Sequence, residues 1–180
     1  GEGIVVFAVG MVPNIDILSN TGIKTDRGGV LIDNKMRTNI ENIYAVGDCT
    51  QFESGIDNKV IPGKLATNAV PMAKVLGFNF LGQNREYQGF FNGAATKVGK
   101  YFVGGTGFTE EVAKQRGYDV VVGESEVTTQ FPIMPESKVK KLKIIADRKT
   151  HKVLGAQILS GVPVCARIDL ITFAIQKGAT

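Results

Sequence analysis

Residue types that commonly build catalytic or metal sites are scarce in this sequence of 180 residues. It has no tryptophan, one histidine and two cysteines. The cysteines, Cys49 and Cys165, lie far apart and form neither a C-x-x-C motif nor a metal-ligand spacing. The sequence therefore predicts no metal site and no structural disulfide, a cysteine usage that suits a reducing, cytoplasmic compartment.

Long apolar runs and charge blocks are absent as well. No stretch approaches the ~20 apolar residues that a membrane-spanning helix needs, and no signal peptide is recognisable. The net charge of +4 is spread along the chain, without a basic block interleaved with aromatic residues. We therefore expect binding to neither membrane nor nucleic acid. The 43% hydrophobic content and 22 glycines are typical of a globular α/β protein rich in tight turns.

The most informative stretch comprises residues 38–48. Residues 43–46 form an apolar run that predicts a buried strand of a parallel sheet, and the run stops at Gly47, which Asp48 follows. Ligands of open α/β sheets bind outside the carboxyl ends of strands, where a glycine admits a close backbone approach. A carboxylate there can accept hydrogen bonds from the hydroxyls of a polyol or sugar chain. The alternative is a plain strand that ends in a Gly-Asp turn.

A helix is predicted over residues 65–76, with Gly77 as its C-terminal cap. Pro71 lies inside this span and costs ~3 kcal/mol in a regular helix interior. Either the helix kinks there or its first turn ends before it. Without further motifs, the alternative for this segment is an ordinary packing helix.

The start of the chain predicts two further elements. Residues 3–10 are apolar and read as a parallel-sheet strand that ends at Gly10, although such a strand needs neighbours on both sides. Residues 22–36 predict a small hairpin with a strand at 30–32. Neither element suggests a site on its own.

A polar, Gly-flanked segment at residues 82–89 predicts a boundary between two lobes. The second lobe combines short strands with two helices, one capped by Thr109 and stopped by Gly117, the other apolar on one face and stopped by Gly178. Strands are predicted at residues 94–98, 100–104, 119–122, 124–129, 141–146 and 152–159, and helices at 109–117 and 164–177.

Together and in this order, these segments resemble the C-terminal portion of the FAD-dependent pyridine nucleotide–disulfide oxidoreductases. The branch with the most similar motifs contains NADH oxidase, NADH peroxidase and coenzyme A-disulfide reductase. Thr38 and residues 43–48 resemble the family's second flavin-binding motif. The resemblance implies that Gly47 and Asp48 bind FAD, with Asp48 on the ribityl chain. It places Leu65, Ala66 and Thr67 at the flavin pyrimidine, and Gly10, more weakly, near the nicotinamide of NAD(P)H, although Val12 stands where relatives often carry Arg.

The implied fold is α/β plus α+β: a remnant of the NAD- and FAD-binding sheets followed by an antiparallel-sheet dimerisation domain with helices. Residues 1–20 would end the NAD(P)H-binding domain, 21–85 would be the C-terminal segment of the FAD-binding domain, and 90–180 the dimerisation domain. The resemblance also implies a homodimer. In the full-length enzyme, electrons would pass from NAD(P)H through FAD to oxygen, peroxide or a disulfide such as coenzyme A disulfide.

Two parts of such an enzyme are missing from the sequence: the G-x-G-x-x-G that cradles the FAD pyrophosphate, and the branch's active-site cysteine. We expect no catalytic residue in this chain, and the alternative is that the isolated chain is a non-catalytic dimerisation and binding module. Cys49 is interpreted as a small buried packing residue and His151 as a surface-turn residue. Lysines 138, 140, 141 and 143 could meet coenzyme A phosphates or form the solvated face of a strand.

Overall fold

The computed structural model describes residues 3–180, and its internal contacts divide the chain into two units. The first unit comprises Gly1–Phe52 and Lys64–Tyr87, and the second comprises Glu53–Gly63 and Gln88–Thr180. The sequence predicts a boundary near residues 82–89, but not that residues 53–63 would pack with the second unit.

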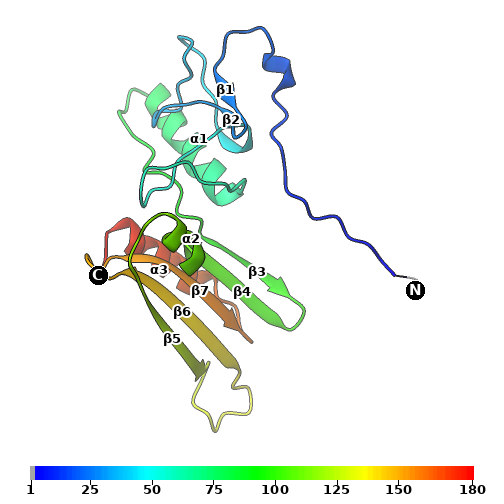
Figure 1. The fold of residues 1–180 in the computed structure, drawn as a ribbon, viewed down its shortest axis with the longest axis vertical. Helices are drawn as coiled ribbons and strands as arrows, with labels where there is room; N and C mark the ends of the chain where they lie inside the picture. The colour runs from blue at the N-terminus through cyan, green and yellow to red at the C-terminus, as the bar shows by residue number, and fades with distance from the viewer. Residues whose placement is uncertain (1–2) are drawn as a thin grey trace. The chain divides into compact units, whose positions relative to one another are not determined.

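The first unit combines a short hairpin, two 3-10 turns and one long helix (Figure 1). Its elements are η1 (Asp16–Leu18), β1 (Thr25–Asp26), β2 (Gly29–Val30), η2 (Gly47–Cys49) and α1 (Ala66–Phe80). The predicted hairpin is confirmed, since β1 pairs antiparallel with β2. Its second strand is shorter than the predicted 30–32, because only Gly29 and Val30 have partners on β1.

Two predicted strands of the first unit are wrong. Residues 3–10 form no strand, and their side chains are exposed, with Ile4 at 95% and Phe7 at 85% of full exposure. A strand exists only when a neighbour satisfies its backbone groups, and the described chain places none beside this segment. Residues 43–46 likewise join no parallel sheet, because Tyr44 makes only an isolated antiparallel bridge to Arg37.

Helix α1 runs further than its sequence predicts. It passes through Pro71 and through Gly77, which was expected to cap it, and ends at Phe80. The terminating glycine is Gly82 instead, with a φ of 82°, where the chain leaves the helix. Asn68 and Met72, one turn apart, are the fully buried residues that hold α1 against the unit.

The second unit is an antiparallel sheet with two helices, as predicted, and the sheet has five strands (Figure 1). The strand order is β3-β4-β7-β6-β5. The strands are β3 (Ala94–Val98), β4 (Tyr101–Gly107), β5 (Val120–Thr128), β6 (Val139–Asp147) and β7 (Val153–Ser160), and the helices are α2 (Glu110–Gln115) and α3 (Cys165–Gln176). The two strands predicted at 119–122 and 124–129 are one continuous strand, β5, which pairs with β6 along its whole length.

The core of this unit lies between α3 and one face of the sheet. Ile158, Val164 and Ile168 form the buried centre. Half-buried apolar residues pack around them: Ala95, Phe102, Leu142 and Ile171. Gly104 allows this close packing, because a Cβ there would lie 2.7 Å from the Ile168 Cγ1 atom. The predicted caps of α2 are confirmed, since the Thr109 hydroxyl accepts a hydrogen bond from the Val112 N–H at 3.2 Å and Gly117 has a φ of 88°.

Candidate functional site

The turn formed by η2 is fixed from within and presents a free carboxylate. Gly47, with a φ of 80°, begins the turn, and its carbonyl accepts hydrogen bonds from the Thr50 N–H at 3.0 Å and the Thr50 hydroxyl at 2.7 Å. Thr50 is fully buried, whereas Asp48 is exposed. Within the described residues, no hydrogen bond or ion pair engages the Asp48 carboxylate, so its acceptor oxygens remain open to a ligand.

The start of α1 carries unpaired backbone donors. Leu65 is the N-cap in extended conformation, no side chain caps this end, and the Leu65 carbonyl accepts from Asn68 and Ala69. The N–H groups of Ala66 and Thr67 therefore lack an intrahelical acceptor, and both residues are exposed. Donors at the positive end of a helix can bind an anion or a polar carbonyl edge.

The turn and the helix start lie against each other. A Cβ added at Gly47 would lie 3.4 Å from the Ala69 Cβ, within the second turn of α1. The structure therefore brings together Gly47, Asp48 and the residues at 65–67. It does not bring Gly10 to them, because Gly10 lies in the exposed N-terminal segment with nothing within 4 Å of its Cβ position.

Lys64 also belongs to this site, although sequence patterns gave no sign of it. Its ammonium group donates to the carbonyl oxygens of Gly28 at 2.6 Å and Thr50 at 2.7 Å, and lies 5.4 Å from the centre of the Phe52 ring. Burial lowers the pKa of Lys64, while the nearby Asp48 carboxylate is the largest of the influences that raise it. Lys64 thus connects the hairpin, the η2 turn and the first residues of α1.

Asn68 of α1 and Tyr87 form a second polar group, and Asn68 is fully buried, so no ligand can reach it. The Tyr87 hydroxyl donates a hydrogen bond to the Asn68 Oδ1 atom, and burial raises the pKa of Tyr87. The Asn68 Nδ2 atom is buried without a partner. Asn68 follows Ala66 by two residues, which is about 200° around a helix, so it faces the interior while Ala66 faces outward.

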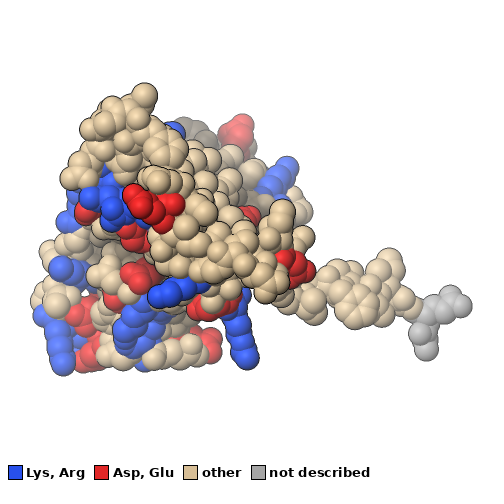
Figure 2. Space-filling view, turned by 90° about the horizontal axis from the view of Figure 1, so that it is seen from above, with Lys and Arg blue, Asp and Glu red and all other residues tan. Residues whose placement is uncertain are grey.

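Other candidate chemistry is sparse within the described residues. Both cysteines are free and exposed, so the prediction that Cys49 is a buried packing residue is wrong. His151 is exposed in the β6–β7 turn, as expected. In residues 3–180 we find no cluster of three or more residues that could hold a metal ion, and no helix with the length and apolarity to span a bilayer. Figure 2 shows basic and acidic side chains intermingled on the visible face.

An open helix start beside a Gly-Asp turn offers backbone donors and a carboxylate to one polar or anionic ligand, and an antiparallel α+β unit follows it in the chain. The sequence profile of the pyridine nucleotide-disulphide oxidoreductases matches residues 3–73, and that of the family's dimerisation domain matches residues 93–180. The chain belongs to the pyridine nucleotide-disulphide oxidoreductases.

Its relatives include oxidases and sulfur reductases. The chain is 34% identical over 173 residues to an NADH oxidase of Methanocaldococcus jannaschii, covering 96% of this chain and 38% of that protein. It is 32% identical over 178 residues to a CoA-dependent NAD(P)H sulfur oxidoreductase of Pyrococcus furiosus, covering 98% and 40%. Among solved structures, a NAD-dependent persulfide reductase from A. fulgidus superposes with a TM-score of 0.88 at 30% identity, covering 95% and 32%. The chain thus spans 40% or less of the length of these proteins.

Proposed function

We propose that this chain is the C-terminal part of an NADH oxidase-like flavoprotein, which transfers electrons from NAD(P)H through FAD to oxygen, peroxide or a disulfide. One observation carries the proposal: the free Asp48 carboxylate and the uncapped start of α1 lie side by side in a chain of this family. The names of its relatives, NADH oxidase and CoA-dependent sulfur oxidoreductase, support the reaction class and include a coenzyme A-dependent activity.

The residues present suit one half of an FAD site. FAD supplies a ring that takes up a hydride and releases electrons. Asp48 offers acceptor oxygens to the ribityl hydroxyls, and the positive φ of Gly47 turns the backbone so that Asp48 is exposed. The free N–H groups of Ala66 and Thr67 would donate to the pyrimidine edge, where the helix dipole favours negative charge. Gly10 would approach the nicotinamide of NAD(P)H, a role that only the resemblance supports.

The proposed domain division follows the resemblance: residues 1–20 end the NAD(P)H-binding domain, 21–85 the FAD-binding domain, and 90–180 form the dimerisation domain. We propose a cytoplasmic enzyme, in keeping with two free cysteines. No residue of this chain is assigned a catalytic role.

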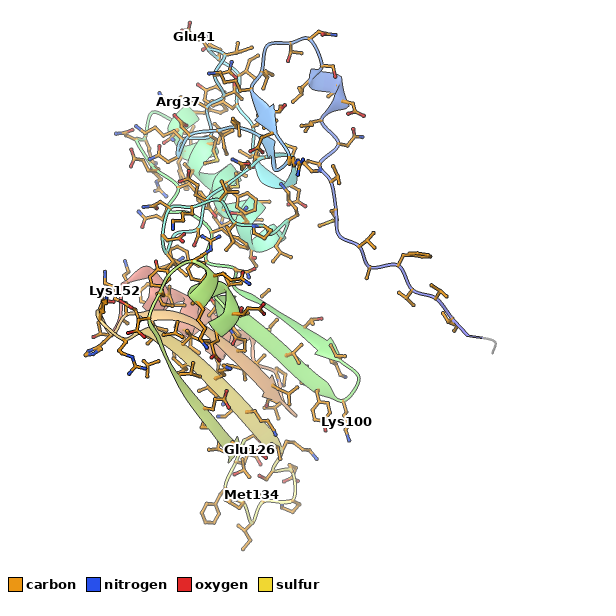
Figure 3. All side chains as sticks on the ribbon, in the orientation of Figure 1. Arg37, Glu41, Lys100, Glu126, Met134 and Lys152 are labelled. Carbon is orange, nitrogen blue, oxygen red and sulfur yellow. The ribbon has the colours of Figure 1, made fainter. Side chains whose placement is uncertain are left out.

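We also propose that the second unit forms a homodimer. Its match to a dimerisation-domain profile supports this, as do apolar side chains that the unit leaves exposed. Leu170 and Phe173 on α3 are 68% and 56% exposed, and Met134 projects from the tip of the β5–β6 hairpin (Figure 3). Exposed apolar surface often marks interfaces, and a two-fold dimer would bury the same surface on both copies.

A second candidate function concerns the chain by itself. Its sequence contains the Gly47-Asp48 segment and the α1 start, but no G-x-G-x-x-G motif for the FAD pyrophosphate. The isolated chain would then be a dimerisation and binding module without catalysis.

Replacing Asp48 by Ala in the full-length protein tests the flavin assignment. Loss of a hydrogen bond to a charged group costs ~1.5–3 kcal/mol, which corresponds to a roughly 10- to 150-fold weaker affinity for FAD. The measurement is FAD fluorescence quenching on titration into the apoprotein. Asp16→Ala, at another exposed aspartate of the first unit, is the matched control and should leave affinity unchanged. Equal FAD affinity in the Asp48 and Asp16 variants would remove the assignment.

A further inference from the structure

Lys64 is held more firmly than a lysine in a loop usually is. Its ammonium group donates to two backbone carbonyl oxygens, at 2.6 Å on Gly28 and 2.7 Å on Thr50, and lies over the Phe52 ring. These partners precede Lys64 by 36, 14 and 12 residues, so the side chain connects segments that are distant in sequence. A lysine ammonium has three donors, and two of them are used here.

Lys64 and its carbonyl partner Thr50 belong to the two sides of the proposed flavin site. Thr50 closes the η2 turn that presents Asp48, through its own bonds to the Gly47 carbonyl. Lys64 directly precedes Leu65, the N-cap of α1. The bond from Lys64 to Thr50 therefore ties the turn that carries the carboxylate to the helix start that carries the free N–H groups.

The charge of Lys64 acts in the same place. Asp48, Cys49 and Asp26 are the groups close enough to raise its pKa, against burial, which lowers it. Lys64 is half-buried, so its positive charge is less screened by water than that of an exposed lysine. Because Lys64 directly precedes the N-cap Leu65, its charge adds to the positive potential at the start of α1.

We infer that Lys64 is a positioning residue of the flavin site: it fixes the Asp48 turn against the start of α1 and adds a positive charge that favours the reduced, anionic flavin. The inference rests on the proposed function and assigns to Lys64 a role that neither the sequence motif nor the family match identifies. Fixing the two segments reduces the ordering that binding requires, so the affinity for FAD rises. The nearby charge raises the reduction potential of the bound flavin.

The test uses the full-length protein with Lys64→Met, Lys64→Gln and Lys64→Arg, and Lys74→Met as a control. Lys74 is an exposed lysine on α1, so its replacement changes net charge equally without touching the η2 turn. Hydrogen exchange of residues 28–30 and 47–51 reports whether Lys64 holds these two segments together. FAD titration reports the affinity for FAD, and the midpoint potential of the bound flavin reports the effect of the Lys64 charge.

We expect Lys64→Met to speed exchange in both segments, to weaken FAD binding about tenfold, and to lower the midpoint potential. Lys64→Arg should restore the potential, because it keeps the charge, and Lys74→Met should change none of the three. Lys64→Gln keeps a donor without the charge, so it should bind FAD more tightly than Lys64→Met yet retain the low potential. It also replaces Lys64→Met if that variant fails to fold.

Unchanged FAD affinity and potential in a folded Lys64→Met or Lys64→Gln protein would overturn the inference. A weaker affinity with an unchanged potential would also overturn it, since that result indicates a structural tie alone. If the unmodified full-length protein binds no FAD, the proposed function fails instead, and the two failures are distinguishable.

Discussion

The ion pair between Asp57 and Arg116 is the most deeply buried of the chain's described salt bridges, and its removal should destabilise the second unit strongly. The side chains are 7% and 15% exposed. The Arg116 Nη1 atom donates to both Asp57 carboxylate oxygens at 2.8 and 2.7 Å, and its Nη2 atom donates to the Val60 carbonyl at 2.8 Å. The guanidinium also lies 4.8 Å from the centre of the Phe108 ring.

Asp57→Ala should cost ~3–5 kcal/mol of the free energy of unfolding, because it leaves the Arg116 charge buried without its counter-ion. In a unit of roughly 100 residues, each kcal/mol lowers Tm by about 4–8 °C, so a fall of at least ~12 °C is expected. Arg116→Met in the same chain removes the stranded charge. The double variant should therefore lose less stability than the sum of the two single variants.

Urea unfolding followed by circular dichroism measures the stability of the unmodified chain, the two single variants and the double variant. Asp119→Ala is the matched control, since its ion pair with Arg148 is 54% and 60% exposed and should contribute less than ~1 kcal/mol. A loss of less than ~1 kcal/mol in Asp57→Ala, or additive losses in the double variant, would refute the claim that this buried pair stabilises the second unit.

Three further predictions concern the surface and the isolated chain. Hydrogen bonds and charge from Lys114 and Lys143 lower the pKa of Glu110 to about 2. The contribution of Glu110 to stability is therefore complete above its unfolded-state pKa of 4.5 and disappears as the pH falls toward 2. Glu110→Gln should make Tm fall less steeply over that pH range than it does in the unmodified chain. High salt should reduce the difference in Tm between the two proteins. The isolated chain should bind FAD poorly and oxidise no NAD(P)H; steady turnover above a free-flavin control would contradict this. The isolated chain should sediment as a homodimer at micromolar concentration. Leu170→Asp should shift it to monomer, since an unpaired desolvated charge costs several kcal/mol. If the unmodified chain sediments as a monomer, the proposed dimer is refuted.

Local patterns predicted the second unit well. The caps of α2, the β6–β7 hairpin and the apolar face of α3 depend on residues within a few positions of one another, and each is found in the structure. The end of α1 was misjudged because glycine caps a helix only where its φ becomes positive, and Gly82 rather than Gly77 has that conformation.

The remaining features of the first unit depend on contacts between residues that are distant in sequence, which local patterns do not predict. Residues 3–10 and 43–46 have strand-like composition. No described segment pairs with residues 3–10, and residues 43–46 pair only locally, through one isolated bridge between Tyr44 and Arg37. Lys64 escaped notice because its partners are backbone carbonyls 14 and 36 residues away, which no side-chain pattern encodes. The adjacency of the Asp48 turn and the α1 start was expected only through the family resemblance.

Hydrogen exchange of the full-length protein with and without FAD tests the central claim most directly. If residues 47–51 and 65–67 form one half of the flavin site, added FAD should slow exchange in both segments, while the β6–β7 hairpin stays unchanged and serves as the internal reference. Slower exchange in neither segment, in protein that demonstrably binds FAD, would contradict the account.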